Sequence, residues 1–331
     1  MKILHVGKKG NMERYTNSSV NLEKYEMIDM HKDTPVSELL DAGADADVII
    51  VDAITSISAE LIQRMSNLKL IHSEGVAFNA IDVATATEKG IYVCNCSGMN
   101  GAAVAEQTIL LMLGVLKDAV NNDAAVRIGK QIEVKEGYMV RGDLKELADC
   151  TVGLVGFGAI AQAVARLTKA FGVETYYYSR HRASTEIEAE TGAKYLPLDE
   201  LLATCNMISM HVPVTSETKE MANDAFFAKM QEGSYFINTA RGEVVDEHAL
   251  VRAIECGKVA MAGLDTLSGE PVKTDHILIN QKPEIEKRIF FSPHIGGITA
   301  SSFKRGYEII WKNVQKLEAG QKPENIVNRI S

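Results

Sequence analysis

Short, mostly apolar runs alternate with helix-like patterns along the first hundred residues. The runs with strand character lie at 2–7, 26–30, 47–53, 68–75 and 91–96. Between them, apolar residues recur at helical spacing. Strands joined by helices in this way are typical of a parallel sheet that is covered on both faces. The pattern therefore predicts an α/β domain over this part of the chain.

A second alternation of the same kind begins at Thr151. Before it, residues 102–130 predict a long, mostly apolar helix followed by a polar one. The strand-like runs that follow lie at 151–156, 173–178, 207–212, 235–240, 259–265 and 288–294. Six strands with interleaved helices predict a complete doubly wound, Rossmann-type sheet.

The last stretch of the chain predicts a helix whose apolar residues return to the first domain. These residues are Phe303, Ile309, Ile310, Val314 and Leu317. We therefore predict an α/β fold of two domains. A Rossmann doubly wound parallel sheet occupies 101–297, and a smaller flavodoxin-like domain is formed by 1–100 together with 298–331.

Composition narrows the classes of partner. The 331-residue chain is 46% hydrophobic and 24% charged, which is enough apolar content for two packed cores. The formal charge of -9 predicts no nucleic-acid partner and no membrane partner, since either needs a basic face. No apolar run approaches the roughly 20 residues that span a bilayer. Five cysteines without CxxC spacing fit reduced thiols, so we expect a cytoplasmic protein.

A glycine-rich turn, GFGAIA at 156–161, follows the first strand of the second alternation and opens a helix. The first glycine permits a tight turn, the second lets the backbone approach a pyrophosphate, and the third position needs a small side chain. The free N–H groups at the start of the helix attract phosphate. We therefore expect a dinucleotide to contact Gly156, Gly158, Ala159 and Ile160.

The next strand ends without the carboxylate that would bind a ribose 2′-hydroxyl. Ser179 and Arg180 stand there instead, and these side chains can bind and neutralise a 2′-phosphate. The sequence thus predicts that NADP(H) is preferred, with NAD(H) possible. The alternative is that Arg180 and Arg182 form only a solvated basic turn.

The order of segments resembles the D-isomer-specific 2-hydroxyacid dehydrogenase family over nearly the whole chain. The segments that carry the resemblance are VGLVGFGAIAQAVA, MISMHVPVTSETKEMANDAFFAKMQEGSYFINTARGEVVDEHAL, AGLDTLSGEP and FFSPHIGG. The resemblance implies that the domain formed by 1–100 and 298–331 binds the substrate and that 101–297 binds the dinucleotide.

The resemblance also implies roles for individual residues. Arg241 resembles the arginine that grips the substrate carboxylate and keto oxygen, His294 the acid/base histidine, and Glu270 the acid that pairs with it. The loop of Gly75, Val76 and Ala77 resembles the one whose N–H groups bind the substrate carboxylate. The further cofactor contacts implied are His211, Pro213, Thr239, Ala240, Asp265 and Gly296. The family usually has glycine where this chain has Ala77, and often aspartate where it has Asn79.

The chemistry explains why these residue types are needed. Reduction of a 2-keto acid requires hydride delivery to C2 and a proton for the developing alkoxide, and histidine supplies that proton near neutral pH. A carboxylate at 270 would favour the protonated imidazole and fix its tautomer. The guanidinium at 241 would orient the substrate and stabilise charge. Each of these residues also has a purely structural alternative. Arg241 would then be a surface charge at a strand end, Glu270 a solvated acid in a turn, and His294 a hydrogen-bonded core histidine.

Two hypotheses of function follow. The first is an NAD(P)-dependent oxidoreductase that transfers a hydride at C2 of a small 2-keto or 2-hydroxy acid, with glyoxylate- or hydroxypyruvate-type substrates. The alternative is a nucleotide-sensing or corepressor-like binding protein on the same fold. The apolar stretch 104–116 and the resemblance predict a homodimer. We expect no metal site, because no HxH or HxxxH spacing is found among His5, His31, His72, His181, His248 and His276. For His211 we expect a scaffold role in its loop and not an acid/base role.

Overall fold

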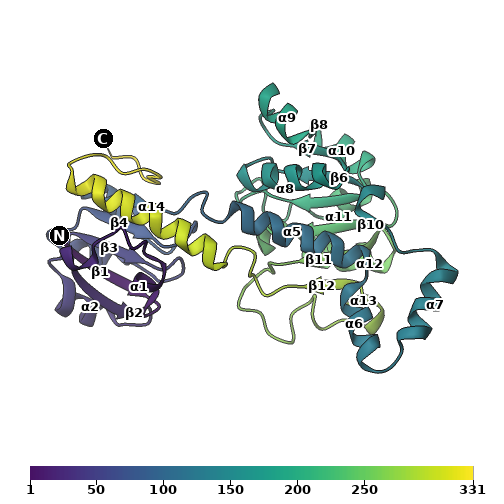
Figure 1. The fold of residues 1–331 in the computed structure, drawn as a ribbon, viewed down its shortest axis with the longest axis horizontal. Coiled ribbons are helices and arrows are strands. Elements are labelled where there is room, and N and C mark those ends of the chain that lie inside the picture. The colour runs from purple at the N-terminus through teal and green to yellow at the C-terminus, as the bar shows by residue number, and fades with distance from the viewer. Residues whose placement is uncertain (331) are drawn as a thin grey trace. The chain divides into compact units, whose positions relative to one another are not determined.

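The computed structural model describes residues 1–330. The chain divides into two compact units, the first made of Met1–Asn100 with Ile298–Ser331 and the second of Gly101–Gly297 (Figure 1). Each unit is an α/β structure built on one parallel sheet. The predicted fold class is confirmed.

The first unit holds a five-stranded parallel sheet in the order β2-β1-β3-β4-β5, which is the flavodoxin-like order. Every residue of β3 and β4 is buried, because helices cover both faces of the sheet. The strand bounds are β1 Lys2–Gly7, β2 Glu26–His31, β3 Val48–Val51, β4 Leu70–Ser73 and β5 Tyr92–Cys94.

Short helices connect these strands, and the long C-terminal helix packs back on the sheet. The helix bounds are α1 Asn11–Tyr15, η1 Leu22–Lys24, α2 Val36–Gly43, α3 Ala59–Arg64, α4 Val83–Glu88 and α14 Ala300–Glu318. Thr299 caps the start of α14 by accepting a hydrogen bond from the N–H of Ser302. Ile310, Trp311 and Val314 then join a core cluster with strand residues, so the predicted return of the C-terminal helix is confirmed.

The second unit holds a seven-stranded parallel sheet in the order β12-β11-β10-β9-β6-β7-β8. In this order β6 to β11 follow the doubly wound sequence of a Rossmann fold, and β12 extends it at one edge. The strand bounds are β6 Thr151–Val155, β7 Glu174–Tyr178, β8 Lys194–Tyr195, β9 Met207–Met210, β10 Ser234–Asn238, β11 Val259–Leu264 and β12 Ile289–Phe291.

Helices lie on both faces of this second sheet (Figure 1). Their bounds are α5 Gly101–Leu116, α6 Ala119–Arg127, α7 Gln131–Arg141, η2 Leu147–Asp149, α8 Ala159–Ala170, α9 Thr185–Thr191, α10 Leu198–Thr204, α11 Asp224–Lys229, η3 Gly242–Val244, α12 Glu247–Glu255 and α13 Pro283–Glu286. The sequence pattern missed several of these elements, among them α7, α9, α11 and α13, together with the strand β8. Helix α7 buries no residue, and α13 and β8 are too short to show a period.

The apolar stretch 104–116 lies in α5 and is mostly buried within its own unit, where Leu111, Met112 and Val115 join the core around β6. The packing of α5 in this core accounts for the apolar character of the stretch without a second subunit, so of the two reasons for a homodimer only the family resemblance remains. Within residues 1–330, no helix is long and apolar enough to cross a bilayer.

Candidate active site

The sequence-predicted residues of the second unit follow the carboxyl ends of its strands. Because all seven strands are parallel, these ends lie along one edge of the sheet. The glycine turn follows β6, Ser179 follows β7, His211 follows β9 and Arg241 follows β10. In open parallel sheets, ligands bind at this edge where the strand order reverses, which here is between β6 and β9.

The glycine turn after β6 has the geometry that a dinucleotide needs. Gly156 has a φ of 95°, and a Cβ atom there would lie 2.5 Å from the carbonyl oxygen of His211. Gly158 begins α8 with open space around its Cα, and no side chain caps the helix. Ala161 is buried under the turn. The first N–H groups of α8, which include those of Ala159 and Ile160, are therefore left for a phosphate.

The turn after β7 carries exposed charge. Arg180 Nη1 lies 3.1 Å from Glu217 Oε2, and both side chains are largely exposed. Arg182 instead forms two hydrogen bonds, of 2.8 and 2.9 Å, with the carboxylate of Glu188. Hydrogen bonds from Arg182 and Tyr177 lower the pKa of Glu188 to about 2. The hydroxyl of Ser179 donates a hydrogen bond to the carbonyl oxygen of His181.

His294 and Glu270 lie in contact. The distance from His294 Nδ1 to Glu270 Oε2 is 2.6 Å, and both side chains remain partly exposed. The other carboxylate oxygen of Glu270 accepts the N–H of Leu267 at 2.8 Å, which fixes the carboxylate in its turn. His294 has a φ of 55°, a left-handed conformation that is rare for residues other than glycine and is frequent at functional sites. The pair predicted from the sequence is thus assembled from segments 24 residues apart.

Asp265 holds the turn that carries His294. This buried carboxylate accepts the N–H groups of Ile295 and Gly296 at 3.0 and 2.9 Å, and the hydroxyl of Ser292 at 2.6 Å. A Cβ atom at Gly296 would lie 2.8 Å from Asp265 Oδ2, so a side chain at this position would displace the carboxylate. The expected contact between Asp265 and a nicotinamide carboxamide stays a prediction. No sequence signal indicated that Asp265 also organises the histidine turn.

Arg241 follows β10 on a backbone that Asn238 fixes. Asn238 donates from Nδ2 to the carbonyl of Arg241 at 2.8 Å and accepts the N–H of Ala240 at 3.0 Å. A Cβ atom at Gly242 would lie 1.9 Å from the carbonyl carbon of Leu267, so the arginine loop packs directly against the Glu270 turn. The guanidinium is exposed, and its Nη1 donates to the carbonyl of Ala240 at 2.7 Å.

A second acid–histidine pair, Glu247 and His276, supports the turn that carries Glu270. This pair was not predicted from the sequence. Glu247, at the start of α12, accepts the N–H of Ser268 at 2.8 Å, and its other oxygen lies 3.1 Å from His276 Nε2. Burial raises the pKa of Glu247, although the Ser268 hydrogen bond and His276 oppose this effect. In the sequence, neither Glu247 nor His276 belongs to a motif that signals this contact.

The remaining cofactor candidates differ in exposure. Burial lowers the pKa of His211 to about 4, so its imidazole is neutral near pH 7 and lies 2.9 Å from Ser209 Oγ. Thr239 is buried, with its hydroxyl 2.9 Å from that of Thr108. Pro213 is exposed in the loop that follows His211. These placements favour a scaffold role for His211, as the sequence indicated.

The predicted carboxylate-binding loop lies in the first unit, directly after β4. The carbonyls of its three residues are all used: Gly75 accepts Cys96 N–H, Val76 accepts Asn95 Nδ2 and Ala77 accepts Ser73 Oγ, at 2.8, 2.7 and 2.7 Å. Among residues 1–330, no hydrogen-bond partner is found for the N–H groups of Val76 and Ala77. Two adjacent free N–H groups form a site suited to an anion.

Comparison with known proteins identifies the family. Residues 109–296 match the family model described as D-isomer specific 2-hydroxyacid dehydrogenase, NAD binding domain. The chain belongs to the D-isomer-specific 2-hydroxyacid dehydrogenase family. Its members here include a glyoxylate reductase of Thermococcus litoralis, 35% identical over 319 residues that cover 93% of this chain and 92% of the relative. A hydroxypyruvate reductase of Thermotoga maritima is 35% identical over 303 residues, covering 91% and 94%.

Solved structures agree with this family assignment. D-mandelate dehydrogenase of Rhodotorula graminis superposes with a TM-score of 0.85 at 26% identity, covering 100% of this chain and 98% of the other. D-lactate dehydrogenase of Aquifex aeolicus, complexed with NAD and lactic acid, gives 0.77 at 29% identity, covering 99% and 100%. This dehydrogenase is therefore an NAD(P)-dependent oxidoreductase that transfers a hydride at C2 of a 2-keto or 2-hydroxy acid.

Proposed function

We propose that this dehydrogenase is an NADPH-preferring reductase of small 2-keto acids of the glyoxylate and hydroxypyruvate class. The observation that carries the proposal is the 2.6 Å contact between His294 and Glu270 beside the Arg241 loop. A histidine that is hydrogen-bonded to a carboxylate can protonate the substrate carbonyl, and a neighbouring exposed guanidinium can bind the substrate carboxylate at the same time. The names of the glyoxylate and hydroxypyruvate reductases among its relatives support the substrate class.

Each side chain has a defined task in this reaction. When bound, the nicotinamide cofactor supplies the hydride. Arg241 binds the substrate carboxylate and polarises the C2 carbonyl. His294 donates a proton from Nε2 to the carbonyl oxygen as negative charge develops there, and Glu270 holds the opposite ring nitrogen. In the reverse direction, the neutral imidazole accepts the hydroxyl proton. In the first unit, we assign the free N–H groups of Val76 and Ala77 to the substrate carboxylate.

Oxidation of NADPH with a panel of 2-keto acids tests the proposed function. We expect turnover with glyoxylate and hydroxypyruvate and weaker turnover with larger 2-keto acids. Turnover restricted to bulky substrates would contradict the substrate class. Tight NADPH binding without turnover of any member would favour the nucleotide-sensing alternative.

The preference for NADPH rests on the turn after β7. Arg180 pairs only with an exposed glutamate, Glu217, so its guanidinium can turn to a 2′-phosphate at little cost. Arg182 is already held by both oxygens of Glu188. These contacts make Arg180 the discriminating residue and Arg182 its matched control.

The variant Arg180→Ala is expected to raise the KM for NADPH about 10- to 100-fold, the loss that follows removal of a charge-assisted phosphate contact. The KM for NADH should change much less, because NADH has no 2′-phosphate. Arg182→Ala should leave both values near those of the wild type. Steady-state kinetics with the two cofactors measure this difference, and equal losses for NADPH and NADH in Arg180→Ala would refute the assignment.

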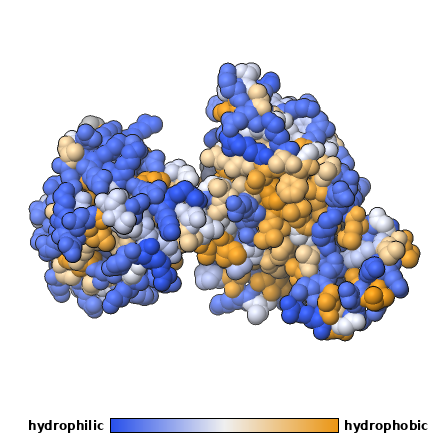
Figure 2. Space-filling view, viewed as in Figure 1, coloured by the Kyte–Doolittle hydropathy of each residue, from blue (hydrophilic) through white to orange (hydrophobic). Residues whose placement is uncertain are grey.

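We further propose that the enzyme is a homodimer that pairs through α6 and α7. Neither helix buries a residue within the chain, yet both expose large apolar side chains (Figure 2). These are Val120, Val126, Ile132, Met139 and Val140. Helices of this length that bury no face are marginal alone, and a second copy paired by twofold symmetry is the commonest partner in soluble oligomers.

Sedimentation at micromolar concentration is expected to give about twice the chain mass of 36.2 kDa. The double variant Met139→Glu and Val140→Glu should be a monomer, because it places two negative charges at the exposed end of α7 in the proposed interface. Phe171→Glu is the matched control, because Phe171 is also exposed and apolar but lies at the end of α8. A wild-type monomer would remove the proposal.

The cysteines support a reducing compartment, and we propose the cytoplasm. All five are free thiols, and four of them are buried. Burial raises the pKa of Cys94 and of Cys205 to about 12, so these thiols are unreactive.

A further inference from the structure

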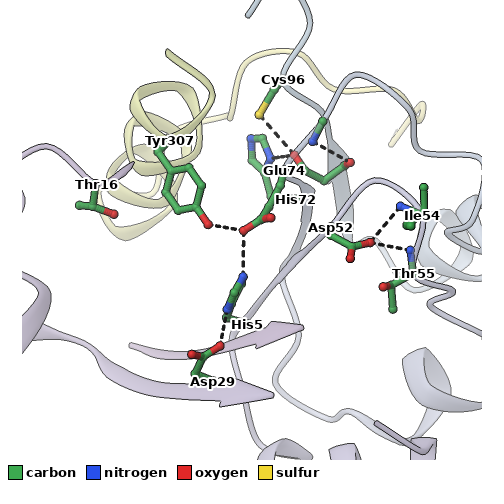
Figure 3. A network of polar contacts seen from close by, with 12 residues as sticks. His5, Thr16, Asp29, Asp52, Ile54, Thr55, His72, Glu74, Cys96 and Tyr307 are labelled. Atoms are coloured by element: carbon green, nitrogen blue, oxygen red, sulfur yellow. Dashed lines mark hydrogen bonds and ion pairs between the residues drawn. The ribbon is translucent and has the colours of Figure 1, made fainter. Parts of the chain in front are cut away.

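His5 is a fully buried histidine held between two carboxylates in the first unit (Figure 3). Its Nδ1 lies 2.5 Å from Asp29 Oδ1, and its Nε2 lies 2.8 Å from Glu74 Oε1. Asp29 stands opposite His5 in the register of β1 and β2, whereas Glu74 is the first residue after β4. The same Glu74 oxygen accepts the hydroxyl of Tyr307 from α14.

The charge state of this cluster follows from its geometry. A neutral imidazole carries one N–H, so it can donate to only one of the two carboxylates, whereas an imidazolium donates to both. Burial on its own lowers the pKa of His5, but the hydrogen bonds and charges of Glu74 and Asp29 outweigh burial and raise it. Burial and Glu74 raise the pKa of Tyr307, which therefore stays a hydroxyl donor.

Glu74 is joined directly to the carboxylate-binding loop. Gly75 follows it in the chain, and a Cβ atom at Gly75 would lie 2.6 Å from the Cβ of Ala53, so the loop packs against the end of β3. The three loop carbonyls are bound, as described above, which leaves the side chain of Glu74 as the charged anchor of the segment. The side chain of Glu74 is only 4% exposed, and burying its negative charge without a cationic partner would destabilise the fold.

We propose that His5 and Glu74 are positioning residues, and that the bridge from Asp29 through His5 to Glu74 fixes the loop whose Val76 and Ala77 N–H groups bind the substrate carboxylate. The proposal rests on the proposed 2-keto acid reductase function. It assigns no contact between His5 and the substrate, because His5 is fully buried. His5 therefore acts through Glu74 and the backbone of the loop.

The proposal makes substrate binding depend on pH. The titratable groups around His5 are Asp29 on β2, Glu74 after β4, Tyr307 on α14 and, beside Glu74, the thiol of Cys96. Because the pKa of His5 is raised in the fold, the bridge is intact below the unfolded value of about 6.5 and is lost as the pH rises through the folded value. The KM for the keto acid should rise on that alkaline side, whereas the KM for NADPH should not.

The test is the variant His5→Gln, assayed from neutral to alkaline pH. Glutamine is neutral and cannot bridge both carboxylates. We expect the KM for glyoxylate to rise about tenfold near neutral pH, because the charge-assisted hydrogen bonds that hold the loop are lost. The kcat and the KM for NADPH should stay within about twofold of the wild type. The alkaline rise in KM should disappear in the variant. His31→Gln is the control, because His31 pairs with Asp33 on the exposed surface of the same unit.

Several outcomes would overturn the inference. A lower melting temperature of His5→Gln with an unchanged glyoxylate KM and pH profile would make the cluster only a stabilising one. If His5→Gln does not fold, Tyr307→Phe removes one donor to Glu74 and keeps the ring, and an unchanged KM in that variant would have the same meaning.

Binding of oxamate, a 2-keto acid analogue that is not reduced, separates this inference from the proposed function. If the wild type turns over no 2-keto acid, the proposed function fails, but weaker oxamate binding by His5→Gln than by the wild type would still support the loop assignment. Equal affinities would overturn the inference alone. A wild type that neither turns over a 2-keto acid nor binds oxamate would overturn both.

Discussion

The variant His294→Asn is expected to lower the kcat for glyoxylate reduction by about a hundredfold to ten-thousandfold, the range that a general acid or base contributes. Asparagine is the appropriate replacement because it tolerates the left-handed φ of 55° found at His294. The two N–H groups that Asp265 binds belong to Ile295 and Gly296, so the turn should keep its backbone. The loss is then one of proton transfer and not of folding.

The kinetics can identify the step that is lost. Once protonation is slow, the chemical step limits turnover, so the primary isotope effect with NADPH deuterated at the transferred position should rise toward its intrinsic value. The KM for NADPH should change little. His31→Asn is a control, because His31 pairs with Asp33 on the exposed surface of the first unit and has no part in the mechanism. A kcat within about tenfold of the wild type would assign the proton to another group.

Glu270→Gln separates the histidine from its support. Glutamine can still contact Nδ1 of His294, but it removes the negative charge that lies 2.6 Å away. The expected loss in kcat is smaller than that of His294→Asn, because the proton donor remains. An equal loss in the two variants would mean that the pair acts as one unit, as residues of a catalytic triad do.

Some features of the fold were predictable because their physical signal is local. A fully buried parallel strand such as β3 is apolar on both faces, and this gives a continuous apolar run. The glycine turn after β6 was predictable for a similar reason, because the φ of 95° and the approach of His211 admit only glycine. Helix α7 left no such signal, since it buries nothing.

The contacts that support the site were not predictable from sequence patterns. The contact between Asp265 and Gly296 joins residues 31 positions apart, and that between Glu74 and Tyr307 joins residues 233 apart. Each depends on where strands and helices come together in the fold, and not on any local period. The sequence does not distinguish a buried histidine such as His5 from an exposed one, so its contacts with Asp29 and Glu74 can be identified only from the structure.

Arg241→Gln is expected to lower kcat/KM for the keto acid by about 100- to 1000-fold, since a fixed cationic donor at a developing oxyanion contributes a factor of this size. The position of the backbone at 241 is set by Asn238 and by the close packing of Gly242 on Leu267, and the guanidinium adds only one exposed hydrogen bond, to the carbonyl of Ala240. The melting temperature should therefore stay near that of the wild type.

Arg241→Lys distinguishes charge from geometry. A lysine keeps the positive charge but lacks the planar fork that binds a carboxylate through two hydrogen bonds, so it should recover only part of the loss. Arg252→Gln is the control, because Arg252 is an exposed arginine of the same unit that pairs with Asp224. Full activity of Arg241→Lys would show that Arg241 acts only as a charge. Full activity of Arg241→Gln would remove it from the site, and the carboxylate would then depend on the N–H groups of Val76 and Ala77 alone.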